Sequence, residues 1–203
     1  MQVYEHITYD QAKHISIASL PGMQERTIIT SSLSKTFSVT GWRIGWAIAT
    51  SPIASAISNI HVKLTDSAPA PFQEAAVTAL RSLPEYFQSL RNEYEAKRDR
   101  VIKILVGVGL QVHFVPQGSF FIFAELPESC HLSDMEFVAK LIEKAGVAAV
   151  PGCGFFRTNP SLPDSNYQKR YIRFAFCKSN TTLKAAQQRM GEIVDSDGCL
   201  TLY

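Results

Sequence analysis

The pattern of apolar and polar positions predicts several helices along the chain. One opens at Ser51 and Pro52, and its apolar residues recur at the spacing of one helical face until the run SAPAPF ends it. The longest pattern begins at Pro84, a residue suited to the first helical turn, and has one apolar and one charged face. Ser133 and Glu136 have the spacing of a capping box. The first predicted helix begins at residue 51. The others cover residues 72–80, 84–108, 133–145 and a segment from about 182.

Short runs of β-branched and aromatic residues predict strands between these helices. The first two runs are brief and apolar, which is typical of strands in a parallel sheet that is buried on both faces. The predicted strands cover residues 27–31, 44–49, 112–115, 120–124, 147–150 and 171–176.

The segment between the first two predicted strands carries the clearest chemical pattern. Lys35 stands three residues after Ser32, and Arg43 stands eight residues after Lys35. A partly desolvated lysine beside other cations loses its proton readily and can then form an imine with an aldehyde. A serine hydroxyl and the planar guanidinium of an arginine both bind phosphate oxygens. The spacing therefore indicates a pyridoxal phosphate site, with Lys35 as the attachment point and Ser32 and Arg43 as phosphate ligands.

The motif has two other interpretations. Ser-x-x-Lys is also the nucleophile signature of penicillin-binding enzymes, but the accompanying Ser-Asp-Asn and Lys-Thr-Gly motifs do not occur in the sequence. The second interpretation is that Lys35 is an ordinary surface residue on an exposed loop, as a single lysine usually is. The additional presence of Gly41, Trp42, Gly45 and Trp46 in the same run favours the cofactor site.

The run SKTFSVTGWRIGW resembles the cofactor-attachment segment of class I aminotransferases, which are pyridoxal phosphate enzymes of fold type I. It is most similar to the branch of kynurenine, glutamine-phenylpyruvate and cysteine-conjugate aminotransferases. Further similar segments are VYEHI, PQGSFFIF, VPGCGFF and YIRFAFCKS. The resemblance implies an α/β fold. Residues 1–83 would be the C-terminal part of a large cofactor domain with a mostly parallel sheet, and residues 84–203 a connector helix with a small α+β domain.

The same resemblance covers only the C-terminal half or so of a usual family member. It implies that Tyr4 hydrogen-bonds the phenolic oxygen of the cofactor. Met1 stands where the family has the aspartate that pairs with the pyridine nitrogen. We therefore expect a truncated chain that, expressed alone, is poorly soluble or associated and shows little turnover.

The second chemical pattern is Arg173 in the apolar run YIRFAF. A buried guanidinium without a partner is costly, so this arginine requires an anion. In the aminotransferases the corresponding arginine binds the α-carboxylate of the substrate. An arginine on an edge strand whose side chain extends to water remains the alternative.

The implied reaction is the transfer of an amino group from an aromatic, kynurenine-like or sulfur-containing amino acid to a 2-oxo acid, with Lys35 as general base. Two alternatives stay open. A cysteine-S-conjugate β-lyase would use the same residues, and a catalytically incomplete fragment would act only by association with a full-length partner. Family members are homodimers, so the full-length form is expected to be a homodimer.

The composition limits the kinds of partner that the chain is expected to bind. A net charge of +2 from 20 basic and 18 acidic residues predicts neither a nucleic-acid nor a membrane partner. The four cysteines form no Cys-x-x-Cys pair and the histidines show no ligand spacing, so no metal site is expected. No signal or membrane-spanning run is apparent, which predicts a cytoplasmic protein. A mitochondrial or plastid location stays open if a transit peptide is missing.

Overall fold

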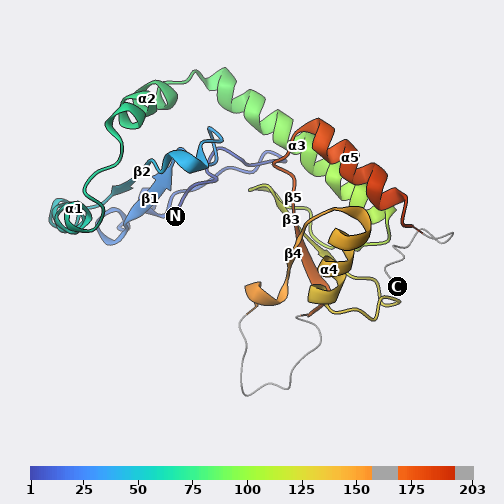
Figure 1. Cartoon of the computed structure of the whole chain (residues 1–203). Helices are drawn as coiled ribbons and strands as arrows, with labels where there is room; N and C mark the ends of the chain where they lie inside the picture. Colours follow the sequence, from blue (N-terminus) through green and yellow to red (C-terminus); the bar gives the residue numbers. More distant parts are fainter. Residues whose placement is uncertain (157–168, 195–203) are drawn as a thin grey trace, which may run out of the picture. The chain divides into compact units, whose positions relative to one another are not determined.

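A computed structural model describes residues 1–156 and 169–194. The chain forms two compact units. The first contains Met1–Asn92 with Gln117–Ser119, and the second contains Glu93–Pro116 with the residues from Phe120 on. The long helix α3 (Pro84–Gly107) contributes residues to both (Figure 1).

The first unit is built on a small sheet of two strands, β1 (Ile29–Ser32) and β2 (Gly45–Ile48), which lie side by side in Figure 1. They pair antiparallel, with Ser32 opposite Gly45. The expectation of parallel pairing for these strands is therefore wrong. The connection between them contains the short 3-10 helix η3 (Thr40–Trp42) and no α-helix, so the chain turns straight back. Parallel neighbours need a crossover connection, usually an α-helix that crosses the face of the sheet, and this connection contains none.

Two α-helices follow the sheet of the first unit, α1 (Ser51–Thr65) and α2 (Ala70–Leu80). The short 3-10 helices η1 (Ile17–Ser19) and η2 (Gln24–Arg26) precede it. The core of this unit forms where α2 packs on the β1–β2 connection. The hydrophobic cluster there consists of the buried residues Leu33, Ile44 and Ala76, packed against Phe37, Val39, Trp42, Trp46, Ala68, Phe72 and Ala79. Val3, Ile7 and Tyr9 of the N-terminal segment are also buried.

The second unit contains an antiparallel sheet of β3 (Phe121–Glu125), β4 (Val150–Pro151) and β5 (Tyr171–Ala175), in the order β3-β5-β4. Burial alternates along β3 and β5, as expected for strands with one face in a core. The buried face consists of Ile122, Ala124, Ile172 and Phe174. The opposite face is half-buried, and it carries Arg173.

The helices α4 (Asp134–Ala145) and α5 (Asn180–Gly191) complete the second unit (Figure 1). The predicted capping box at the start of α4 is confirmed: the Ser133 hydroxyl accepts from the Glu136 backbone N–H, and the Glu136 carboxylate accepts from the Ser133 N–H. The apolar sides of α3, α4 and α5 are buried. They contribute Val101, Ile104, Leu105, Phe137, Val138, Leu141, Leu183 and Met190.

Two other strand predictions differ from the structure. Residues 112–115 form no strand; only an isolated bridge joins Gln111 to Glu125, and Phe114 is 86% exposed. The strand predicted for 147–150 begins only at Val150 and ends at Pro151. An apolar run forms a strand only where a neighbouring strand pairs with it, and most of these two segments has no pairing strand among the described residues. The predicted helices and the remaining strands are confirmed within two or three residues.

No helix of the described residues is long and apolar enough to cross a membrane. Within residues 1–156 and 169–194, no group of histidine, cysteine, aspartate and glutamate is arranged to hold a metal ion. Cys130, Cys153 and Cys177 are free thiols.

Candidate functional site

The Lys35 segment is a closed loop whose two ends are fixed by the β1–β2 pair. Ser32 ends β1 opposite Gly45, and the Leu33 N–H donates to the Ile44 carbonyl at 3.2 Å. This pairing brings the two ends of the loop together, so that Ser32 and Arg43 lie at the same end of the sheet. The sequence spacing that suggested a phosphate site therefore corresponds to a spatial grouping in the first unit.

The close approach of the strands depends on Gly45. A Cβ atom placed on Gly45 would lie 2.8 Å from the backbone oxygen of Ser31 and 3.2 Å from the Cβ of Ser32. Both distances are shorter than ordinary van der Waals contacts, and the nearer atom is backbone and cannot rotate away. Any other residue here would push Ser32 away from the strand that follows Arg43.

Hydrogen bonds inside the loop set the positions of its polar residues. The Thr40 hydroxyl donates to the Ser34 carbonyl at 2.9 Å, and the Ser38 N–H donates to the Lys35 carbonyl at 3.3 Å. Arg43 has left-handed backbone, with φ of 59°, and its Nη1 donates to the Thr40 carbonyl at 2.8 Å. That bond uses one of the five donors of the exposed guanidinium.

The beginning of α3 also holds this loop. The Tyr86 hydroxyl donates to the Thr36 carbonyl at 2.8 Å, next to Lys35, and the Tyr86 ring stacks on Phe37 with centroids 5.3 Å apart. Phe87 meets the same Phe37 ring edge-on at 6.3 Å. Lys35 is half-buried within this packed loop, and on the other side Trp42 stacks on Phe72 of α2 at 4.6 Å. The position of the lysine backbone is thus fixed by aromatic contacts from two helices.

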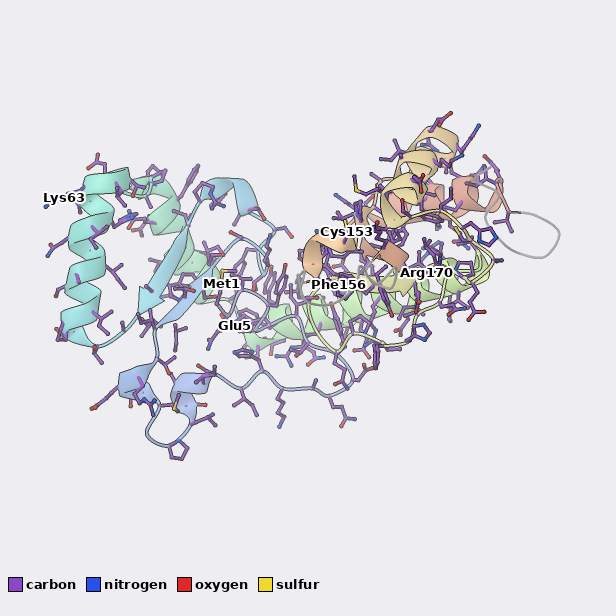
Figure 2. All side chains as sticks on the ribbon, turned by 90° about the horizontal axis from the view of Figure 1, so that it is seen from below. Met1, Glu5, Lys63, Cys153, Phe156 and Arg170 are labelled. Atoms are coloured by element: carbon purple, nitrogen blue, oxygen red, sulfur yellow. The ribbon has the colours of Figure 1, made fainter. Side chains whose placement is uncertain are left out.

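The N-terminal segment lies beside β1. The Gln2 N–H donates to the Thr30 carbonyl at 2.7 Å, and the Ser31 hydroxyl donates to the Glu5 carboxylate at 3.2 Å. Tyr4 is half-buried in this segment, whereas Met1 is 90% exposed. Figure 2 labels Met1 and Glu5, which bracket Tyr4. The fold thus brings Tyr4 alongside the strand that ends at Ser32.

Arg173 lies in the second unit, on β5, opposite Phe123 of β3 and Val150 of β4. Its guanidinium carbon is 4.2 Å from the centre of the Phe121 ring and 4.5 Å from that of Phe155, so two aromatic rings contact the cation. Its Nε is buried and has no hydrogen-bond partner among the described residues. Because a buried donor without a partner is costly, an anionic partner fits this position.

The face of the sheet around Arg173 is aromatic. The Phe123 ring meets Phe155 at 5.4 Å and Phe156 at 6.3 Å, both edge-on, and Phe156 lies 5.6 Å from Tyr171. Sequence reasoning identified Arg173 but did not predict these ring contacts. The run VPGCGFF was the only available signal, since it places two aromatic residues after a permissive glycine turn.

The structure therefore places the five candidate residues in two groups. Tyr4, Ser32, Lys35 and Arg43 belong to the first unit, and Arg173 belongs to the second. The first group contains an amine, a hydroxyl and a guanidinium, and the second a guanidinium in contact with two aromatic rings.

This combination of fold and residues defines an aminotransferase-type protein. The family model for aminotransferase class I and II matches residues 2–188, and the chain belongs to this family. Members of the family generally depend on pyridoxal phosphate.

Curated relatives and solved structures agree with this assignment. The chain is 35% identical to the kynurenine–oxoglutarate transaminase of Dictyostelium discoideum over 93% of its own length, and 34% identical to the methionine aminotransferase of Escherichia coli over 95%. The solved N-succinyldiaminopimelate aminotransferase of Mycobacterium tuberculosis superposes with a TM-score of 0.82 at 37% identity and 93% coverage. The expected fold type I class is thereby confirmed. The chain spans 46%, 48% and 47% of these three proteins, about half of their length.

The residues of the first unit fit pyridoxal phosphate. The half-buried amine of Lys35 suits the aldehyde, while the hydroxyl of Ser32 and the guanidinium of Arg43 suit the phosphate. The close strand approach at Gly45 places Ser32 and Arg43, the two candidate phosphate ligands, at one end of the sheet.

Proposed function

We propose that this chain carries the residues of a pyridoxal phosphate-dependent aminotransferase, which in its full-length form transfers an amino group from an amino acid to a 2-oxo acid. The observation that supports the proposal is the closed loop that contains Lys35 and whose ends, next to Ser32 and Arg43, are joined by the β1–β2 pair. The names of the relatives suggest aromatic, kynurenine-like or sulfur-containing amino acids as donors. Amino and 2-oxo acids would be the small-molecule partners, and the full-length form would be a homodimer.

Each residue of the loop has a separate task in this proposal. When bound, pyridoxal phosphate supplies an aldehyde for covalent attachment and a ring that accepts electrons. Lys35 would provide the amine for attachment and would move a proton at the α-carbon of the substrate. Ser32 and Arg43 would hold the phosphate, and Tyr4 would donate a hydrogen bond to the phenolic oxygen.

Arg173 would bind the α-carboxylate of the substrate. A guanidinium binds a carboxylate through two parallel N–H donors, which fixes both distance and plane. The rings of Phe121 and Phe155 contact the guanidinium and restrict its orientation. Such restriction lowers the entropy lost when the substrate is held in reactive geometry.

The experiment is covalent labelling of Lys35. The full chain is mixed with pyridoxal phosphate, reduced with borohydride, digested and analysed by mass spectrometry. We expect the cofactor mass on the Lys35 peptide in the wild type and none at this position in Lys35→Ala. Lys63→Ala is the matched control, since Lys63 is an exposed lysine on α1 (Figure 2). Equal labelling of wild type and Lys35→Ala would refute the assignment.

A second candidate function is non-catalytic association with a full-length aminotransferase. Helix α1 is described in full and has no buried residue. Its exposed apolar side chains include Ile60, Val62 and Leu64, which are 58%, 57% and 77% exposed. A helix with this composition is usually covered by a partner. Analytical ultracentrifugation combined with a transaminase assay separates the two functions. Transamination by a monodisperse preparation of this chain favours the first, and an inactive chain that sediments only with a full-length family member favours the second.

A cysteine-S-conjugate β-lyase would use the same residues. It differs in product, because it releases a thiol, ammonia and pyruvate in place of a new amino acid. Product analysis with a cysteine conjugate and a 2-oxo acid distinguishes the two reactions.

A further inference from the structure

A buried carboxylate of the second unit has no part in the proposed chemistry. Asp134 is 1% exposed although it is the first residue of α4. Aspartate is almost never fully buried unless its charge is paired or hydrogen-bonded. The partners of Asp134 therefore indicate what it does.

The two oxygens of Asp134 bind different elements. Oδ1 accepts from the Met135 N–H at 2.9 Å, at the start of its own helix. Oδ2 accepts from the Cys153 N–H at 2.7 Å, in the short 3-10 helix η4 (Cys153–Phe155). The Cys153 side chain also hydrogen-bonds this carboxylate, which raises the pKa of the thiol. Asp134 thus connects the N-terminus of α4 to η4.

The same turn is attached to the sheet one residue earlier. The Gly152 N–H donates to the Tyr171 carbonyl at 2.7 Å. A Cβ atom on Gly152 would lie 2.3 Å from that carbonyl oxygen, so no larger residue allows this approach. Gly152 fixes the turn to β5, and Asp134 fixes it to α4.

This turn carries one of the two rings that contact Arg173. Phe155 ends η4, and its ring centre is 4.5 Å from the guanidinium carbon, while Phe121 contacts the guanidinium from β3 at 4.2 Å. Phe155 is 48% exposed, so burial alone holds its ring weakly. The ring position therefore depends on the backbone of the turn, whose two ends Cys153 and Phe156 are labelled in Figure 2.

We propose that Asp134 is a positioning residue for Arg173: by binding the Cys153 N–H it holds η4, and with it the Phe155 ring, against the guanidinium. The guanidinium plane is then fixed for two-point binding of a carboxylate. This inference rests on the carboxylate-binding role proposed above for Arg173. It adds a residue from a different helix, 39 positions away in the sequence, to that site.

The test compares two substitutions in the first turn of α4, both made in the full chain. Asp134→Asn keeps the size of the side chain but replaces one acceptor oxygen with an NH2 donor. This donor would face a backbone N–H group, with which it cannot form a hydrogen bond. Glu136→Gln is the matched control. It also neutralises a carboxylate at this helix end, but among the described residues the hydrogen bonds of the Glu136 side chain go to Ser133 of the capping box. If Asp134 only stabilised the end of the helix, the two substitutions would have similar effects on Arg173.

Two readouts decide the outcome. The first is the Arg173 Nε–H signal in NMR spectra of ¹⁵N-arginine-labelled protein, assigned with Arg173→Lys. The flanking rings should shift it in the wild type, and Asp134→Asn should move it toward the position of an exposed arginine. The second is the Kd for 3-phenylpropionate, a carboxylate with an apolar tail. We expect it to rise about tenfold in Asp134→Asn, the equivalent of one charge-assisted hydrogen bond, and less than about twofold in Glu136→Gln.

The outcomes separate the two proposals. An unchanged Arg173 signal in Asp134→Asn, or an equal change in Glu136→Gln, overturns the positioning role. Wild-type protein that binds 3-phenylpropionate no better than Arg173→Lys overturns the carboxylate role of Arg173. In that case the NMR signal alone still decides whether Asp134 orders the guanidinium.

Discussion

Replacing Gly45 by alanine tests whether the close approach of β1 and β2 holds the candidate cofactor loop together. The added Cβ would lie 2.8 Å from the Ser31 oxygen, about 0.6 Å short of ordinary van der Waals contact. The obstacle is backbone, so the strands must separate. Overpacking of this kind costs about 1–3 kcal/mol, and we expect the free energy of unfolding of the first unit to fall by about 2 kcal/mol.

Gly41→Ala is the matched control in the same loop, because a Cβ at Gly41 meets no atom within 4 Å. We expect it to change the free energy of unfolding by less than about 0.5 kcal/mol. Urea unfolding followed by tryptophan fluorescence measures both variants. Trp42 and Trp46 are the only two tryptophans of the chain, and both lie in the first unit, so the signal reports on that unit.

The same strand separation should move Ser32 relative to Arg43 and weaken binding of pyridoxal phosphate. Fluorescence titration should therefore show a higher Kd for Gly45→Ala than for Gly41→Ala. Equal unfolding midpoints and equal cofactor affinities in the two variants would refute the argument from strand contact.

Three further predictions concern single residues. Arg43→Lys keeps the charge but loses the planar donors, so cofactor binding should weaken by about 1.5–3 kcal/mol in the same titration; unchanged affinity would mean that Arg43 does not bind the phosphate. Ser133→Ala removes the helix cap and should lower the stability of the second unit by about 1 kcal/mol, as measured by urea unfolding followed by circular dichroism. The hydrogen bonds from Ser133 lower the pKa of Glu136 below 4.5. The stabilisation from this carboxylate is therefore complete above pH 4.5 and is lost as the pH falls through the lowered pKa. Glu136→Gln should flatten that part of the stability profile, and an unchanged profile would argue against the capping contact.

Local patterns predicted the helices because each has its own apolar period and end signals. The capping box at Ser133 and the proline at the start of α3 are examples in which side chains and backbone of neighbouring residues settle the outcome. The strands were less predictable. Whether β1 and β2 pair parallel or antiparallel depends on the path of the connection, and apolar composition carries no information on it.

The candidate site also has features that local sequence predicts and features that it does not. Ser32, Lys35 and Arg43 are close in sequence, so their spacing alone predicted a shared loop. The aromatic contacts of Arg173 and the bond from Asp134 to Cys153 join residues from separate elements. No local pattern contains such contacts, since they arise only when the sheet and α4 pack together.

The left-handed backbone of Arg43 limits which residues can occupy that position during evolution or engineering. A φ of 59° is strained for any residue with a Cβ and most of all for one branched at Cβ. Valine, isoleucine and threonine are therefore disfavoured by the backbone alone, before any loss of phosphate binding. Glycine would relieve the strain but remove the cation. Arg43→Lys leaves this conformational cost unchanged, because both side chains are long and unbranched at Cβ. The cofactor-binding assay of Arg43→Lys therefore isolates the donor geometry from the backbone strain.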